Sequence, residues 1–552
     1  MKDYDDTISF LGQWGCFQQI VFFLLCASIM PNGFGALSVV FLTAIPSHHC
    51  LVPEVNLSED WRNAIIPIEV VNGEPELSRC SRYRLDVVQN LSAQGFIPDR
   101  DVNLTDLEQE GCVDGWSYNS DTYQSTIVTE FDLVCDDQWK QPFTTTVFYL
   151  GFLAGSFFSG QLSDRFGRKP VLFATMALQT LFTFSEMFSP SWTVFAILLF
   201  FNGLGHNSNY VSGFVLGTEI FTGKVRVLFS SMGVCLGFAV GYMLLPLFAY
   251  FLRDWKSLLL GVSLPGLLYI PFWWFIPESP RWLLSQGRVQ EAEAIVREAA
   301  KKNKVGAPQV IFKDYIAHAD EKETTPKEHH NVLDLLRTDN IRNMSFILCL
   351  VWITMSAGYY GLSLNTSRLH ANPYISCFFS AAVEVPAYIS SWLALRYLPR
   401  RLSVILVLLV AGVSLYFIPL VPKSISELAV ALEMLGKYSI TVGIALIFAY
   451  TAELYPTVLR NTATGTCTTI SRVGSCVVPF LLLLGDYFRY LPYITLGTLS
   501  VVSAFAALFL PESFGRPLPQ TIQEMQKRES MRCPFNTRKE HSKPVVLFES
   551  QL

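Results

Sequence analysis

Three ionisable side chains lie deep inside long apolar segments of the chain. Glu384 is about 11 residues, Lys437 about 10 and Arg472 about 10 residues from the start of its segment. At the rise of an α-helix, each side chain lies roughly 15 Å from the nearer surface of a membrane, close to its midplane. Ionisable residues at that depth are costly, so we treat these three as candidates for a functional site.

A carboxylate and a guanidinium in one site suit a ligand that carries both charges. Arg472 can take a carboxylate in a bidentate contact, and Glu384 can balance an onium group. The sequence therefore favours a zwitterionic ligand. It leaves open a structural alternative, in which Glu384 and either Lys437 or Arg472 neutralise each other as a buried pair.

Aromatic side chains could hold the onium group, because cations bind to the faces of aromatic rings. Trp352 and Tyr359 lie seven residues apart on one face of the apolar segment 342–364, and Tyr360 is beside them. The other aromatic candidates for substrate binding are Tyr210 and Phe448. Each of these residues could also serve helix packing alone, since aromatic residues make up 14% of the chain.

His206 is a further polar residue in an apolar segment. It could carry a proton. Because Asn202, Asn207 and Asn209 surround it in the sequence, we favour a role in hydrogen-bonded packing.

The elements that position these residues are membrane-spanning helices. The chain has 552 residues, of which 51% are hydrophobic and only 16% charged, so it needs lipid as a solvent. Twelve apolar segments are long enough to cross a bilayer: 17–43, 143–162, 170–189, 192–220, 228–251, 256–276, 342–364, 373–396, 402–422, 427–454, 462–484 and 490–510. The first follows an acidic stretch and lacks a positive leader, so we expect it to remain as the first helix and not to be cleaved.

Two halves of the chain repeat one pattern. Thr218-Glu219-Ile220 with Arg226 recurs as Ala452-Glu453-Leu454 with Arg460. Pro277-Glu278-Ser279 recurs as Pro511-Glu512-Ser513, and both pairs of motifs are separated by the same number of residues. A duplicated helical half is typical of secondary transporters, whose substrate site lies between the repeats. The predicted domains are an N-terminal six-helix half (1–276), a cytoplasmic amphipathic linker (277–341), a C-terminal six-helix half (342–510) and a cytoplasmic tail (511–552).

Lys and Arg collect in the short loops after the second, fourth, eighth and tenth segments, which predicts that both termini face the cytoplasm. The long loop 44–141 is then extracellular, which predicts a multi-pass protein of the plasma membrane. Its four cysteines predict two disulfides, and three pairings are possible. These cysteines are Cys50, Cys80, Cys112 and Cys135, and the loop's glycosylation sequons are at Asn56, Asn90 and Asn103.

Residues 160–169 read GQLSDRFGRK and match the G-x-L-x-D-R-x-G-R-K loop of the major facilitator superfamily at every fixed position. This resemblance implies an all-α fold of twelve transmembrane helices in two six-helix repeats. Small glycines allow close helix approach, and the charged residues can form an ion-pair lock at the helix ends. The candidates for this gating role are Asp164, Arg165, Arg168, Glu219, Arg226 and, from the repeat, Arg460.

Longer motifs resemble the organic ion transporter family within that superfamily. They are PESPRWLL at 277–284 and YTAELYPT at 450–457, together with the large loop after the first helix. MKDYD at 1–5, PNGF at 31–34 and WWFIP at 273–277 look like the branch that carries carnitine and ergothioneine. Within this branch some motifs look more like the ergothioneine-type member and others more like the carnitine-type member, so the preferred substrate stays open.

The resemblance has four consequences. It implies secondary active import of betaines and organic cations, driven by sodium; a sodium-independent exchanger of organic cations or anions is the alternative. Relatives that carry only cations tend to have an acid where Arg472 stands, so Arg472 argues for a substrate with a carboxylate. It implies the disulfides Cys50–Cys112 and Cys80–Cys135. Candidate sodium ligands are Asn32, Tyr450 and Glu453, although Glu453 could equally be a gating residue that mirrors Glu219.

Other functions find little support in the sequence. There is no cluster of metal ligands, no nucleophile motif and no soluble catalytic domain, so we expect a transporter and not an enzyme, with no cofactor besides a coupling ion. We expect no nucleic-acid partner. Ser550-Gln551-Leu552 resembles a ligand of PDZ domains, which makes such a protein a possible partner.

Overall fold

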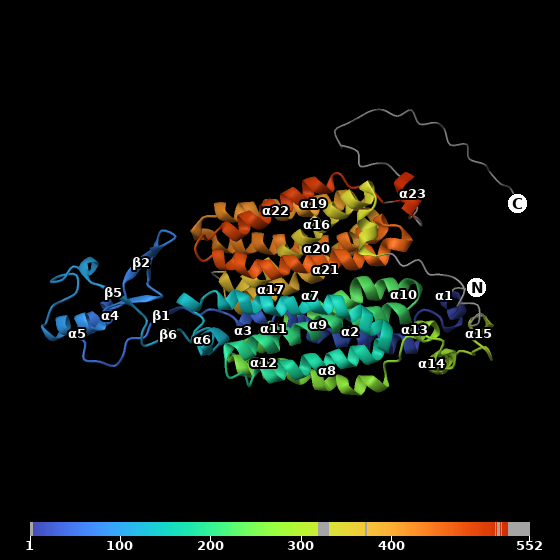
Figure 1. The fold of residues 1–552 in the computed structure, drawn as a ribbon, viewed down its shortest axis with the longest axis horizontal. Coiled ribbons are helices and arrows are strands. Elements are labelled where there is room, and N and C mark those ends of the chain that lie inside the picture. The colour runs from blue at the N-terminus through green and yellow to red at the C-terminus, as the bar shows by residue number, and fades with distance from the viewer. Residues whose placement is uncertain are drawn as a thin grey trace, which may run out of the picture.

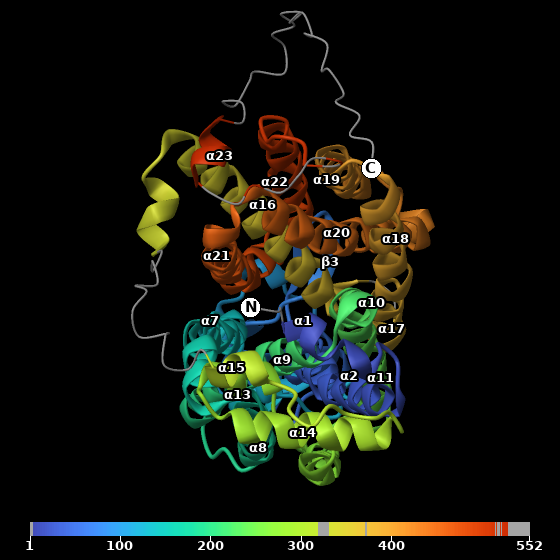
Figure 2. The ribbon, with the colours of Figure 1, turned by 90° about the vertical axis from the view of Figure 1, so that its right-hand side faces the viewer.

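The computed structural model describes residues 4–317, 331–369, 372–513, 515, 519 and 522–527. Its helices form two bundles that lie against each other. The N-terminal half (blue to green in Figure 1) lies beside the C-terminal half (yellow to red), and residues 44–139 project from one end. We call this the loop end. The opposite end is the terminal end, where α1 (Tyr4–Thr7), α13 (Pro280–Ser285), α14 (Val289–Lys302) and α15 (Lys313–Ala317) lie (Figures 1 and 2).

Each half contains six long helical segments, as predicted. Those of the N-terminal half are α2 (Cys16–Ala36) with α3 (Val39–Leu42), α7 (Lys140–Phe166), α8 (Arg168–Glu186), α9 (Trp192–Ile220), α10 (Gly223–Leu228) continuing through the π-helix η4 (Phe229–Gly233) into α11 (Val234–Phe251), and α12 (Trp255–Ser263) with the 3-10 helix η5 (Leu264–Trp274). Those of the C-terminal half are α16 (Asp339–Leu364), α17 (Pro373–Ala382) with α18 (Glu384–Tyr397), α19 (Arg400–Phe417), α20 (Ser426–Leu454), α21 (Thr457–Leu484) and α22 (Leu491–Ala507). Among the described residues, eight helices are long and apolar enough to cross a membrane by length and composition alone.

The eighth segment is not one continuous helix. It breaks between Ala382 and Glu384 into α17 and α18. Pro386 accounts for the break, because it has no N–H to donate to the carbonyl group of residue 382 and its ring crowds that carbonyl. Glu384 therefore begins a new helix in the interior of the bundle.

The projecting loop has a small core of its own. Its strands form three antiparallel pairs, β1 (His48–Cys50) with β6 (Trp116–Tyr118), β2 (Ile68–Val71) with β3 (Glu74–Leu77), and β4 (Ser81–Tyr83) with β5 (Gln109–Gly111). Its helices are α4 (Glu59–Ala64), α5 (Leu85–Ala93) and α6 (Ile127–Phe131). Trp61, Ile65 and Val88 are fully buried in it. The disulfides join Cys50 to Cys112 and Cys80 to Cys135, which is the pairing that the resemblance implied.

The remaining helices lie at the terminal end. They are α13 (Pro280–Ser285), α14 (Val289–Lys302) and α15 (Lys313–Ala317) in the linker, and α23 (Ile522–Lys527) after the last long helix. Buried alanines and Val296 of α14 pack with the N-terminal half, in one hydrophobic cluster with Tyr4 of α1. Residues 280–317 of the linker are thus part of the N-terminal body, whereas Leu335, in the 3-10 helix η6 (Val332–Leu336), packs in the hydrophobic cluster of the C-terminal half.

The two halves are packed together at the loop end. One hydrophobic cluster contains buried residues of both halves there, such as Tyr149 and Leu362. Phe41 stacks on Tyr374 with 5.4 Å between ring centroids, and Thr146 donates a 2.9 Å hydrogen bond to the carbonyl oxygen of Cys476. At the terminal end the hydrophobic clusters are separate, one in each half. The transporter-like bundle is therefore sealed at the loop end.

Candidate functional site

A cavity of about 210 Å³ lies between the two halves, near the middle of the long helices. Its wall comes from α2, α7, α9 and α11 of one half and from α16, α18, α20 and α21 of the other. The predicted binding residues that line it are Arg472, Trp352, Tyr359, Tyr360 and Tyr210, and the predicted sodium ligand Asn32 lines it too. We call it the central cavity.

Arg472 enters the cavity from α21. Its guanidinium donates to the hydroxyl oxygen of Tyr360 at 3.0 Å and to Oδ1 of Asn207 at 3.2 Å, and it lies 5.7 Å from the ring centroid of Phe152. These partners are neutral, and Nε has no partner among the described residues. The guanidinium can therefore accept an anionic ligand group without first leaving a carboxylate.

Close packing of α21 on α16 sets the position of Arg472. A Cβ atom on Gly474 would lie 2.7 Å from the carbonyl oxygen of Ile353, so only glycine permits this approach. Asn207 and Phe152 belong to the N-terminal half. Arg472 consequently joins the two halves across the cavity.

Glu384 and Lys437 form a buried ion pair, which was the alternative left open by the sequence. The Lys437 Nζ atom is 3.5 Å from Oε1 of Glu384, and their side chains are 1% and 0% exposed. Lys437 also donates to the hydroxyl oxygens of Ser363 at 2.5 Å and Ser380 at 3.2 Å. Neither Glu384 nor Lys437 is part of the cavity wall.

Two tyrosines stand between this ion pair and the cavity. The hydroxyl groups of Tyr359 and Tyr388 both donate to Glu384, and both rings line the cavity. Lys437 Nζ lies 4.4 Å from the ring centroid of Tyr359. Glu384 therefore meets the cavity only through tyrosines. Tyr388 was missed in the sequence, although it follows Glu384 by four residues and so shares its helical face.

The other predicted aromatic residues differ in their positions. Trp352 lines the cavity, and its indole N–H donates to the hydroxyl of Thr451 at 3.0 Å. Phe448 contacts the Trp352 ring edge to face with 6.1 Å between centroids, but it is not part of the cavity wall. Tyr210 packs against Phe238, and both line the cavity.

The three predicted sodium ligands do not lie together. Asn32 lines the central cavity, where it donates to Oδ1 of Asn209 at 2.9 Å and lies 3.4 Å from Nδ1 of His206. Tyr450 is at the terminal end, where its hydroxyl donates to the carbonyl oxygen of Pro511. Glu453 is at the same end, in contact with Arg400. In this conformation Asn32, on α2, therefore lies apart from Tyr450 and Glu453, which are both on α20, and the sodium role of the three residues stays a prediction.

His206 has the packing role that the sequence favoured, and it also reaches the cavity. Its ring fits only because residue 35 is glycine: a Cβ atom there would lie 2.1 Å from Cε1 of His206. The Nε2 atom has no hydrogen-bond partner in the described part of the chain.

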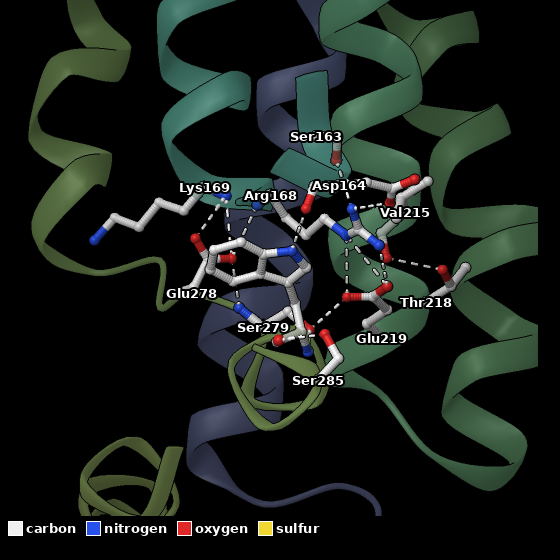
Figure 3. A network of polar contacts seen from close by, with 11 residues as sticks. Ser163, Asp164, Arg168, Lys169, Val215, Thr218, Glu219, Glu278, Ser279 and Ser285 are labelled. Carbon is white, nitrogen blue, oxygen red and sulfur yellow. Dashed lines mark hydrogen bonds and ion pairs between the residues drawn. The ribbon is translucent and has the colours of Figure 1, made fainter. Parts of the chain in front are cut away.

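A polar cluster joins α7, α8, α9 and α13 at the terminal end of the N-terminal half (Figure 3). Arg168 donates to Glu219 at 2.9 Å and to Asp164 at 2.7 Å. Ser279 donates to Glu219 as well. Glu278 accepts the backbone N–H groups of Arg168 at 3.1 Å and of Ser279 at 2.8 Å, so it caps the first turn of α8. We call this the N-terminal cluster.

Burial raises the pKa of Glu278, and its hydrogen bonds from backbone N–H groups lower it.

Two gating candidates lie beside the N-terminal cluster. Arg226 donates to the carbonyl oxygens of Thr218 and Phe221 and pairs with Asp5 at 2.9 Å. The Arg165 guanidinium instead lies 5.4 Å from the ring centroid of Phe166.

The C-terminal half has a matching cluster. Arg400 pairs with Glu453 at 3.4 Å, and Ser513 donates to Glu453 at 2.7 Å. Glu512 accepts the backbone N–H groups of Arg400 at 3.0 Å and of Ser513 at 3.1 Å. Arg460 donates to the carbonyl oxygen of Ala452 at 2.7 Å. We call this the C-terminal cluster; the repeat predicted its existence but not the role of the two capping glutamates.

Comparison with known proteins supports the transporter family that the sequence motifs resemble. Residues 112–525 match the family described as "Sugar (and other) transporter". The chain is 53% identical over 526 residues to "Organic cation/carnitine transporter 2" of Rattus norvegicus, covering 95% of this chain and 94% of the relative. It is 52% identical over 534 residues to "Solute carrier family 22 member 4" of Mus musculus, covering 97% and 96%.

Solved structures support the fold. A partially occluded inward open structure of the xylose transporter XylE from E. coli has a TM-score of 0.59 at 12% sequence identity, covering 91% of this chain and all of that one. The chain belongs to the sugar (and other) transporter family and has the major facilitator fold. It is a multi-pass membrane transporter and not an enzyme, as the sequence predicted.

Proposed function

We propose that this transporter imports zwitterionic betaines, ergothioneine or carnitine, and organic cations across the plasma membrane, with sodium as the coupling ion. The observation that carries the proposal is Arg472, a guanidinium at the wall of the central cavity whose hydrogen-bond partners are neutral. Relatives named as organic cation/carnitine transporters support the same class of substrate.

The opposite charge of a betaine would lie on aromatic rings. Tyr359 and Trp352 offer such faces in the cavity wall. The hydroxyl of Tyr359 donates to the carboxylate of Glu384, which adds electron density to the ring and strengthens its attraction for a cation. Glu384 would thus balance the onium group through Tyr359 and Tyr388, while Lys437 holds the carboxylate in place.

Alternating access fits a bundle that is sealed at one end. In the proposed orientation the loop end is extracellular and both termini are cytoplasmic, so this conformation faces inward. The sequon residues Asn56, Asn90 and Asn103 are exposed on the loop, where they would be open to glycosylation. The proposed PDZ ligand at the C-terminus lies outside the described residues.

Arg472→Ala tests the proposal. We expect uptake of carnitine and ergothioneine to fall at least tenfold, because a charge-assisted hydrogen bond contributes about 1.5 to 3 kcal/mol. Uptake of tetraethylammonium, which has no carboxylate, should persist. Thr468→Ala, at another position of the cavity wall, is the matched control. Equal affinity of parent and Arg472→Ala for a betaine, at equal surface abundance, would refute the proposal.

Sodium coupling needs a separate measurement. Asn32 is the candidate ligand at the cavity; Glu453, which Arg400 and Ser513 already hold at the terminal end, is the less favoured one. Replacing sodium by N-methylglucamine should reduce betaine uptake. Uptake that is independent of sodium and accelerated by substrate on the opposite side would support the alternative, an exchanger of the same fold.

A further inference from the structure

A second cavity, of about 270 Å³, lies at the loop end. Unlike the central cavity, it is lined by three parts of the chain at once. The projecting loop contributes His48 and Arg79, the N-terminal half contributes Gln141, and the C-terminal half contributes Arg368 and Asp486. We call it the loop-end cavity.

The two cavities lie along one seam between the halves. Three helical regions line both: residues 36 and 39 on either side of the α2–α3 junction, 360 and 364 on α16, and 472 and 479 on α21. In each case the first residue faces the central cavity and the second faces the loop-end cavity. The two halves are in contact between the two cavities, where the ring centroids of Tyr149 and Tyr360 are 4.8 Å apart. The loop-end cavity therefore occupies the outer part of the path that a substrate would take.

The charges on the wall of this cavity favour an anionic group. Arg368 pairs with Asp486 at 2.7 Å, and Gln138 of the other half donates to the same carboxylate at 3.3 Å. Arg79 makes only a 3.7 Å contact with Glu76, and its side chain is 55% exposed. Burial lowers the pKa of His48, so its ring is neutral at neutral pH. Two guanidiniums and one carboxylate leave an excess positive charge.

Two buried polar atoms on this wall have no partner among the described residues. The hydroxyl of Tyr123, whose residue is 8% exposed, makes no hydrogen bond, and neither does Oε1 of Gln141. A buried polar group without a partner is unfavourable, so both atoms point to a ligand that can accept one hydrogen bond and donate another.

We propose that the loop-end cavity is a capture site for small carboxylate-bearing zwitterions, the same substrates that the central cavity then receives. Arg79 and Tyr123 hold the carboxylate, and Gln141 accepts a hydrogen bond from a hydroxyl or N–H group of the ligand. The inference rests on the proposed function. It assigns to the disulfide-linked loop a direct part in substrate selection.

Measurement of transport in both directions tests the capture site. In Arg79→Ala the substrate concentration for half-maximal carnitine uptake should rise about twofold to fivefold, the scale of a partly exposed ion pair. The half-maximal concentration for efflux, measured from the cytoplasmic side of inside-out vesicles, should not change. Tyr123→Phe, which removes only the hydroxyl, should shift uptake in the same direction.

The controls separate capture from other effects. Arg100→Ala removes an exposed charge from the same loop outside the cavity and should leave both directions unchanged. Tetraethylammonium uptake should be unchanged in Arg79→Ala. Equal shifts for tetraethylammonium, equal shifts in efflux, or normal carnitine uptake by both Arg79→Ala and Tyr123→Phe would each overturn the inference. Failure of the proposed function looks different, because Arg472→Ala would then leave carnitine transport intact.

Discussion

The N-terminal and C-terminal clusters have the same parts but different charges. In both, a glutamate caps the helix that follows a basic loop, and a serine and an arginine hold a second glutamate. In the N-terminal cluster Arg168 also pairs with Asp164, four residues earlier. The position four residues before Arg400 is Arg396, which lies on the ring of Trp392. Duplication has preserved the cap, and the two halves have diverged around it.

A second difference comes from the N-terminal segment. Asp5 pairs with Arg226 at 2.9 Å and with Arg281 at 3.2 Å, so it ties α1 to α10 and α13. Arg460, the counterpart of Arg226, has a buried Nη2 without a partner in the described part of the chain. In the N-terminal half these ion pairs thus extend from the cluster region to α1, and the following substitutions test whether that matters.

The largest effect is expected from the arginine that pairs with a glutamate in each cluster, Arg168 or Arg400. Arg168→Ala leaves Glu219, whose side chain is 16% exposed, without its guanidinium, and it releases Asp164 as well. We expect transport per surface molecule to fall roughly tenfold or more, since charged hydrogen bonds contribute about 1.5 to 3 kcal/mol each. Arg400→Ala removes the longer, 3.4 Å contact with Glu453 and should cost only a few-fold by the same reasoning. Equal losses in both variants would show that the extra pairing is irrelevant.

A smaller effect is expected from the paired glutamates, where glutamine keeps the hydrogen bonds but not the charge. Glu219→Gln and Glu453→Gln should both slow turnover by roughly threefold to tenfold, since each weakens one partly buried ion pair. The sodium concentration for half-maximal uptake should be the same as in the parent. We expect this because Glu453 is already held by Arg400 and Ser513.

Sodium activation curves for the two glutamine variants check the expectation. A raised sodium requirement in Glu453→Gln alone would mean that Glu453 is an ion ligand in another conformation, and the symmetry between the clusters would then be structural only.

The fold could be predicted from the sequence because each pattern that indicates it is formed by residues close together in the chain. Twelve apolar segments, the GQLSDRFGRK loop and the repeated Glu453 and Glu219 motifs each depend on residues close in the chain. Arg472 could be found in the same way, because an isolated guanidinium in an apolar helix has few alternatives.

The geometry of the site depended on helix rotation and could not be predicted. Glu384 is at the expected depth, but the break at Pro386 and the tyrosines on either side place it behind the cavity wall. Asn207 was visible only as a neighbour of His206, since its contact with Arg472 spans the two halves. Asn32 likewise lies apart from Tyr450 and Glu453, because depth along a helix does not say which helices meet.

A modest effect is expected from the N-terminal segment. Asp5→Asn should reduce transport about twofold, because its two ion pairs are partly exposed and such pairs contribute about 0.2 to 1 kcal/mol. Asp6→Asn, an exposed neighbour, is the matched control. Limited proteolysis should cut the N-terminal segment faster in Asp5→Asn than in Asp6→Asn. Equal cutting rates would mean that packing of Tyr4 on Phe312, with 6.2 Å between ring centroids, holds the segment without the charge.

The smallest effect on the stability of this conformation is expected from Asp164→Asn. The Asp164 side chain is 74% exposed, and its contact with Arg168 spans the turn between α7 and α8. Exposed ion pairs contribute about 0.2 to 1 kcal/mol and are screened by salt, so the melting midpoint of the purified protein should hardly move and should move less at high salt. Arg396→Asp, which gives the C-terminal cluster the same i,i+4 acid, should raise the midpoint by a similarly small amount. A large loss of transport in Asp164→Asn with an unchanged midpoint would be the informative exception. An exposed pair cannot account for such a loss, so Asp164 would have to act in the conformation that is closed at the terminal end, where the two clusters approach each other and its unequal charge would find a partner in the opposite half.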